Sequence, residues 1–163
     1  MITIFTDGSS KGNPGPGGWA AIVAGKGTVT ELGGRENMTT NNRMELRAVI
    51  EGLKNAVGDS IHLHTDSEYI VKGITVWVKS WQKNNWRTAA RKPVLNQDLW
   101  QELIEVSRGK DIKWIVVPGH AGVDANERCD VIATEFADGG YPPLYDGPEH
   151  EYTISFSVSP KTL

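Results

Sequence analysis

Three short β-prone runs, in which apolar residues are mixed with Thr, occupy the first part of the chain and are separated by glycine-rich turns. They cover residues 2–6, 19–24 and 28–33. This pattern predicts three strands that pair antiparallel as a meander. The period then changes, because apolar residues recur at i, i+3, i+4 and i+7 from Leu46 to Leu53. The new period predicts a helix over residues 39–55, capped by Thr40 or Asn41, with its apolar stripe against the sheet.

Strands and helices alternate in the following part of the chain. We expect strands over 61–65 and 112–117, short helices over 67–83, and longer helices over 96–108 and 126–137. This alternation predicts that the later strands run parallel to each other. The predicted fold class is therefore α/β, with a central mixed five-stranded sheet, antiparallel meander plus parallel strands, flanked by helices in one domain over residues 1–137.

Residues 138–163 form a C-terminal extension with a different pattern. A glycine- and proline-rich linker covers 139–148, and four apolar residues then alternate with Thr and Ser: Tyr152, Ile154, Phe156 and Val158. This period predicts a half-buried edge strand that Pro160 would end, and a disordered tail is the alternative. The strand could pair with its own sheet or with another molecule. Nothing in the extension indicates catalysis, so we expect residues 138–163 to be dispensable for it.

The composition indicates one domain in a reducing compartment. The only cysteine, Cys129, cannot form an internal disulfide. No apolar run approaches the roughly 20 residues that span a bilayer, and the N-terminus does not resemble a secretion signal. We expect a soluble cytoplasmic protein with no membrane contact. We also expect a monomer, unless the extension mediates association.

The charges are distributed unevenly along the chain. The net charge is −3, yet residues 69–97 hold six basic residues and no Asp or Glu, which leaves −9 on the remainder (−3 minus +6). The six are Lys72, Lys79, Lys83, Arg87, Arg91 and Lys92. We call residues 72–96 the basic arm. Such a cluster favours contact with phosphates, and a solvated helix face is the alternative.

Four carboxylates lie at the ends of predicted elements. Asp7 and Asp66 follow apolar runs, and ligands bind beyond the carboxyl ends of parallel strands, so these two should lie side by side if their strands are neighbours. Glu45 adjoins the apolar stripe of the first helix, and Asp130 lies near the start of the last. Singly, each could open a turn, cap a helix or solvate a helix face.

Together, the four carboxylates predict a metal site. Clustered carboxylates repel one another and take up protons unless a cation compensates. An all-oxygen set selects hard cations, Mg²⁺ in particular. Two ions roughly 3.5 to 4 Å apart could activate water and stabilise the leaving oxygen of a phosphodiester. We therefore expect two Mg²⁺ ions with substrate, with Mn²⁺ as a substitute.

Six short runs resemble the bacterial type 1 ribonuclease H enzymes (ribonuclease HI) in order and spacing, over residues 1–137. They are Thr-Asp-Gly-Ser at 6–9, Gly-Asn-Pro-Gly-Pro-Gly-Gly-Trp at 12–19, Thr-Thr-Asn-Asn-Arg-Met-Glu-Leu at 39–46, Thr-Asp-Ser at 65–67, Gly-His-Ala-Gly at 119–122 and Asn-Glu-Arg-Cys-Asp at 126–130. The resemblance implies the ribonuclease H-like fold. It also implies an endoribonuclease that hydrolyses the RNA strand of RNA/DNA hybrids by a two-metal mechanism, leaving 5′-phosphate and 3′-hydroxyl ends.

The same resemblance assigns roles to individual residues. Asp7, Glu45, Asp66 and Asp130 match the metal-binding carboxylates of the family. His120 matches a mobile-loop histidine that assists proton transfer or product release, whereas a lone histidine is more often structural or merely exposed. Glu68 stands where relatives tend to carry a glutamine, which puts one contact to RNA in doubt.

The expected substrate contacts fall into two groups. Telling RNA from DNA requires sensing of the 2′-hydroxyl, and amides suit that task. Asn13, Asn41 and Asn42 resemble the family's groove contacts, and Thr40 and Arg43 are candidates for a DNA-strand phosphate; a turn plus a helix cap is the alternative. The basic arm resembles the family's hybrid-binding protrusion. Its expected contacts are Trp77, Trp81, Lys83, Trp86, Arg87, Arg91 and Lys92, with the tryptophans either forming a hydrophobic base or stacking on nucleotides.

Two other functions are compatible with such a fold. One is a different nuclease, such as an exonuclease, resolvase or transposase-type enzyme, because a fold does not fix a function. The asparagine pair and the basic arm argue against it. The other is a catalytically inactive module that binds hybrids or duplex RNA. That function predicts a missing carboxylate, and none of the four is missing.

Overall fold

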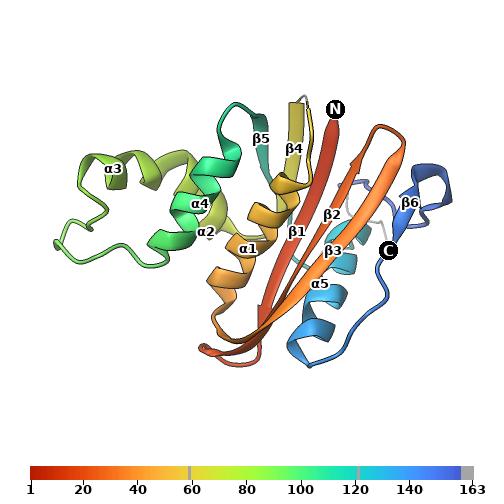
Figure 1. Cartoon of the computed structure of the whole chain (residues 1–163), viewed down its shortest axis with the longest axis horizontal. Coiled ribbons are helices and arrows are strands. Elements are labelled where there is room, and N and C mark those ends of the chain that lie inside the picture. The colour runs from red at the N-terminus through yellow and green to blue at the C-terminus, as the bar shows by residue number, and fades with distance from the viewer. Residues whose placement is uncertain (59, 121, 159–163) are drawn as a thin grey trace.

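The structure is a computed structural model that describes residues 1–58, 60–120 and 122–158, and it places a mixed sheet at the centre of the molecule (Figure 1). The described residues form six strands: β1 Ile2–Ser10, β2 Gly15–Gly25, β3 Thr28–Thr39, β4 Ser60–Thr65, β5 Asp111–Val116 and β6 Asp146–Pro148. Their order is β5-β4-β1-β2-β3-β6. The antiparallel meander and the parallel β1-β4-β5 pairing confirm the predicted α/β class. The predicted number of five strands is wrong, because β6 adds a sixth.

Helices cover both faces of this sheet (Figure 1). The long helices are α1 Asn41–Lys54, α4 Gln97–Ser107 and α5 Asp124–Ala137. The short ones are α2 Glu68–Lys72, the π-helical turn η1 Gly73–Trp77, α3 Val78–Lys83 and the 3₁₀ turn η2 Glu149–Glu151. Thr40 caps α1, since its hydroxyl accepts a hydrogen bond from the Arg43 backbone N–H at 3.2 Å. In the described parts of the chain, no helix is long and apolar enough to cross a membrane.

The side chains of β1 alternate between two hydrophobic clusters. Ile4 packs with α1 and α4 in the cluster on one face, which includes the fully buried Trp100. Phe5 packs with α5 on the other face, beside Ile22 and Ile132. Burying one such side chain contributes about 1.5 to 3 kcal/mol to folding. The two clusters therefore fix α1 and α5 against the central strand β1.

The C-terminal segment, residues 138–158, differs from the prediction. Its strand β6 lies in the stretch predicted to be a linker, where Thr30 pairs with Asp146 at the edge of β3. The predicted edge strand over 152–158 is wrong, because the described residues there make no strand, and Pro160 lies outside them. Tyr152 and Phe156 nevertheless pack on the Phe5 cluster while Thr153 is exposed. Alternating burial requires only an extended chain on an apolar surface, without sheet pairing.

Candidate active site

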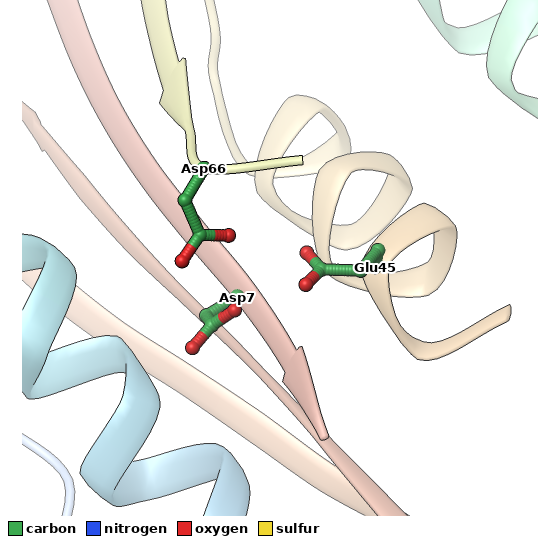
Figure 2. A group of neighbouring side chains, drawn as sticks. All are labelled: Asp7, Glu45 and Asp66. Atoms are coloured by element: carbon green, nitrogen blue, oxygen red, sulfur yellow. The ribbon is translucent and has the colours of Figure 1, made fainter. Parts of the chain in front are cut away.

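Neighbouring parallel strands bring Asp7 and Asp66 together. The parallel pairing of β1 with β4 ends at Thr6 and Thr65, and the two aspartates follow these residues. Asp66 leaves β4 there, as expected, whereas β1 continues to Ser10 along β2. Carboxylate oxygens of Asp7, Asp66 and Glu45 lie within 4.8 Å of one another and could hold a metal ion (Figure 2).

Glu45 reaches this cluster because β1 and α1 pack backbone to backbone. A Cβ atom at Gly8 would lie only 2.3 Å from the backbone nitrogen of Glu45, so only glycine permits this approach. The Glu45 side chain then points from α1 towards Asp7 (Figure 2). It is 4% exposed, and its Oε2 has no hydrogen-bond partner among the described residues. An unpaired buried carboxylate oxygen indicates a missing ligand.

The cluster is electrostatically unfavourable when it is fully ionised. Burial, with a further contribution from the Asp66 charge, raises the pKa of Asp7 to about 8. Burial and the charges of Asp7 and Asp66 raise the pKa of Glu45 well above its usual value, and burial raises that of Asp66. A divalent cation would remove this repulsion. The oxygen-only donor set fits hard cations such as Mg²⁺ and Mn²⁺.

Asp130 lies next to this cluster without being part of it. It is half-buried on α5, and its negative charge raises the pKa values of Asp7 and Asp66. The neighbouring Asn126 is a site residue that we did not single out from the sequence. It is 3% exposed, hydrogen-bonds to Asp66, and has no described partner for its Oδ1. Its position in the Asn-Glu-Arg-Cys-Asp run was the available signal.

His120 lies in the loop that follows β5. It is exposed and has a left-handed backbone with φ of 55°. Its electrostatic contribution lowers the pKa of Asp66, which places it within electrostatic reach of the carboxylates. Gly119 beside it approaches Asp66 closely, because a Cβ atom there would lie 3.3 Å from Oδ2. The loop therefore borders the site.

The first turn of α1 and the turn between β1 and β2 contact each other. The Asn41 backbone N–H donates to the Asn13 side chain at 3.3 Å, while Asn42 is exposed on the same helix end. Arg43 donates two hydrogen bonds to Asp98, at 2.7 and 2.9 Å. The sequence carries no pattern that links Arg43 to Asp98.

The tryptophans of the basic arm form its base, and its cations cover the outside. Trp81 lies 5.9 Å from Trp77, 6.1 Å from Trp86 and 5.5 Å from the core residue Trp100, measured between ring centroids. All three arm tryptophans are half-buried. The exposed cations beyond them are Lys83, Arg87, Arg91 and Lys92. These ring contacts form a hydrophobic base, and stacking of the tryptophans on nucleotides stays a prediction. The arm projects away from the sheet in Figure 1.

Comparison with known proteins decides which family this site belongs to. The sequence profile of the RNase H family matches residues 1–138. The chain belongs to the ribonuclease H family. A ribonuclease H of Mesorhizobium japonicum is 46% identical over 99% of this chain and 94% of its own length. Another, of Thermosynechococcus vestitus, is 52% identical over 83% of this chain and 88% of its own.

Solved structures of ribonucleases H share this fold. LC9-RNase H1, described as a type 1 RNase H with the type 2 active-site motif, has a TM-score of 0.77 and 34% identity, over 89% of this chain and 76% of its own. LC11-RNase H1 in complex with an RNA/DNA hybrid has a TM-score of 0.65 and 23% identity, over 85% of this chain and 98% of its own, a likeness of fold. The ribonuclease H profile ends near the C-terminus of α5, whereas the Mesorhizobium relative aligns almost to the end of the chain.

Proposed function

We propose that this chain is a metal-dependent endoribonuclease that hydrolyses the RNA strand of RNA/DNA hybrids. The observation that carries the proposal is the buried cluster of Asp7, Glu45 and Asp66 in a chain of the ribonuclease H family. Relatives at about half identity bear the name ribonuclease H. Mg²⁺ is the proposed ion and Mn²⁺ a substitute, because the donors are all carboxylate oxygens.

Each carboxylate has a distinct position for binding metal. Asp7, Glu45 and Asp66 would hold divalent ions from β1, α1 and the end of β4, and Asp130 would complete the set from α5. Held by these carboxylates, two divalent ions would supply activation of a water molecule and stabilisation of the leaving 3′-oxygen. The products would carry 5′-phosphate and 3′-hydroxyl ends. His120, exposed beside the site, would exchange a proton with the reacting groups or assist product release.

The hybrid would lie across the end of α1 and the basic arm. Asn13 and Asn41 meet in one hydrogen bond, and with Asn42 they present amides and backbone groups for reading the 2′-hydroxyl groups. Thr40 and Arg43 lie at the N-terminus of α1, where the positive end of the helix dipole attracts a phosphate. The exposed arm cations would neutralise further phosphates. Trp77, Trp81 and Trp86 would hold the arm in position through their packed hydrophobic base.

Cleavage of matched substrates tests this function. RNA/DNA, DNA/DNA and RNA/RNA duplexes of one sequence would be incubated with Mg²⁺ or with EDTA. We expect cleavage of the RNA strand in the hybrid alone, and only with Mg²⁺. Cleavage of DNA would indicate another nuclease on this fold. Hybrid binding without cleavage would indicate the inactive binding module.

Two amide variants compare the activity lost at a carboxylate inside the cluster of three with the activity lost at Asp130 outside it. Asp66→Asn should abolish hydrolysis while hybrid binding remains, because it removes a charge from the buried cluster. Retention of more than about a tenth of the parent rate would contradict shared metal binding, because one general catalytic group is worth about 10²-fold or more. Asp130→Asn should retain more activity than Asp66→Asn, since Asp130 lies outside the cluster of three.

A further inference from the structure

The C-terminal segment is attached to the body through one buried carboxylate, that of Glu31 on β3. The Glu31 side chain is 2% exposed. Its Oε2 accepts hydrogen bonds from Nε of Arg128 at 2.8 Å and from the Tyr152 hydroxyl at 2.7 Å. Its Oε1 accepts from a terminal nitrogen of Arg128 at 3.0 Å and from the Tyr145 backbone N–H at 2.9 Å. We call Glu31, Arg128, Tyr145 and Tyr152 the Glu31 network.

The Glu31 carboxylate needs hydrogen-bond donors from both α5 and the C-terminal segment. A buried carboxylate is stable only when its lone pairs are filled, and two of its four donors come from the C-terminal segment. Arg128 also donates to the backbone oxygen of Pro143, at 3.1 Å. The segment therefore completes and covers the ion pair of Arg128 with Glu31.

Arg128 lies on α5 between two residues that face the carboxylate cluster. Asn126 hydrogen-bonds to Asp66, and the Asp130 charge acts on Asp7 and Asp66. The adjacent Cys129 thiol donates to the backbone oxygen of Phe5, two residues before Asp7. One turn of α5 is thus held to the site on one side and to the Glu31 network on the other.

The C-terminal segment also contacts the strand that carries Asp7. The ring of Phe156 stacks on Phe5 with centroids 6.1 Å apart, and His64 stacks on Phe5 at 4.4 Å. Phe156 in turn stacks on Tyr152 at 5.7 Å. The segment after α5 therefore contacts both elements whose spacing sets the distance from Asp130 to Asp7.

We propose that the Glu31 network sets the position of α5, so that Glu31, Arg128 and Tyr152 are positioning residues for the metal-binding function of Asp130 and for the contact of Asn126 with Asp66. This inference rests on the proposed metal-dependent cleavage. Loss of the network would loosen one ligand-bearing helix and leave the Asp7–Glu45–Asp66 cluster in place. The expected consequence is weaker metal binding with little change in turnover once metal is saturating. The segment would then be dispensable only at high Mg²⁺.

The test uses the full chain and one conservative substitution. Tyr152→Phe removes the hydroxyl that donates to Glu31 and keeps the stacked ring. Tyr141→Phe is the matched control, because Tyr141 is 92% exposed in the same segment. Mg²⁺ would be titrated into each metal-free protein, with the midpoint of the rise in melting temperature as the measure of affinity. Cleavage of a hybrid would be followed over the same Mg²⁺ range.

We expect Tyr152→Phe to raise the half-saturating Mg²⁺ concentration about three- to tenfold in both titrations, because a hydrogen bond to a charged group is worth roughly tenfold or more and only part of this is transmitted to Asp130. The kcat at saturating Mg²⁺ and the KM for hybrid should stay within about twofold of the parent, because the Asp7–Glu45–Asp66 cluster and the basic arm are unchanged. Tyr141→Phe should match the parent. Glu31→Gln, which weakens all four contacts, should shift the Mg²⁺ midpoint further.

A purely structural network gives a different result. If Tyr152→Phe and Glu31→Gln both lower the melting temperature but leave the Mg²⁺ midpoint at the parent value, the proposal is wrong. Failure of the proposed function itself is visible separately, because the parent protein would then not cleave hybrid at any Mg²⁺ concentration. Circular dichroism confirms that each variant is folded. If Glu31→Gln does not fold, the result for Tyr152→Phe decides.

Discussion

Asp7→Asn should make the metal-free protein more stable while it abolishes cleavage. Burial holds the pKa of Asp7 at about 8, compared with an ordinary value of 3.8. The unfolded chain releases this proton near pH 4, whereas the folded protein keeps it until pH rises to about 8. The folded state therefore loses stability as pH increases between these two values. Asparagine does not ionise, so the variant avoids this loss.

The size of the effect follows from the difference in pKa. About four units at roughly 1.4 kcal/mol each set a ceiling of about 6 kcal/mol at pH 8. Part of this is not recovered, because the amide is a poorer partner than the carboxylate for the Gly8 backbone and repulsion between Asp66 and Glu45 remains. We expect a gain of about 2 kcal/mol, which corresponds to roughly 4 to 8 °C in melting temperature for a chain of this size.

Thermal unfolding in EDTA at pH 4.5 and at pH 8 measures this gain. The difference between Asp7→Asn and the parent should be small at the lower pH and large at the higher one. Asp111→Asn, at an exposed aspartate of β5, is the control and should show no such trend. Saturating Mg²⁺ should reduce or reverse the difference, because the parent binds the ion more tightly. A variant that is less stable than the parent at pH 8, or a gain independent of pH, would refute the reasoning.

Three further outcomes are expected. His120→Ala should lower kcat by about 10²-fold without abolishing cleavage, since water partly replaces a general acid or base; unchanged single-turnover and steady-state rates would exclude a catalytic role. Joint replacement of Lys83, Arg87 and Arg91 by alanine should raise the KM more than it lowers kcat. It should also flatten the salt dependence by roughly 0.7 to 0.9 log units per lost phosphate contact, and an unaltered slope would show that the arm does not touch the backbone. Burial opposes the ionisation of Glu31, but its hydrogen bonds from Arg128, Tyr145 and Tyr152 outweigh this effect and lower its pKa. The ionised Glu31 therefore stabilises the fold above the pKa of the unfolded chain, and this contribution is lost as pH falls through the lower pKa of the folded protein. The free energy of unfolding in urea should accordingly differ between Glu31→Gln and the parent at pH 7, and the two values should become equal in acid.

The meander and the long helices could be predicted because each depends on local pattern, whereas the meeting of Asp7 with Asp66 also required β1 and β4 to be neighbours, which the structure shows. A run of apolar residues marks a strand, and parallel neighbours place their ends together. Helix α1 could be bounded from its cap and its period alone. The proposal that these carboxylates share a metal then followed from their chemistry.

The partners of Arg43 and Glu31 could not be predicted in this way. Arg43 meets Asp98 across 55 positions of sequence, and Glu31 is buried by Arg128 and the C-terminal segment. Alternation along β3 places Glu31 on the same face as the buried Val29, but it does not show which residues balance the Glu31 charge there. In the C-terminal segment, the alternation of apolar and polar residues correctly predicted the burial of Tyr152. It did not predict strand pairing correctly, because backbone hydrogen bonds depend on backbone geometry, which the side-chain pattern does not encode.

The short strand β6 has a consequence for self-association. An uncovered edge strand presents free N–H and C=O groups that can recruit a strand from another chain. Strand β6 occupies this edge of β3 from Thr28 to Thr30, and the backbone of Tyr145 pairs with Glu31 just beyond it. The C-terminal segment thus covers the first part of the β3 edge, where a second copy could otherwise add. A chain shortened before Tyr145 should form aggregates through β3, whereas the intact chain should remain monomeric at the same concentration.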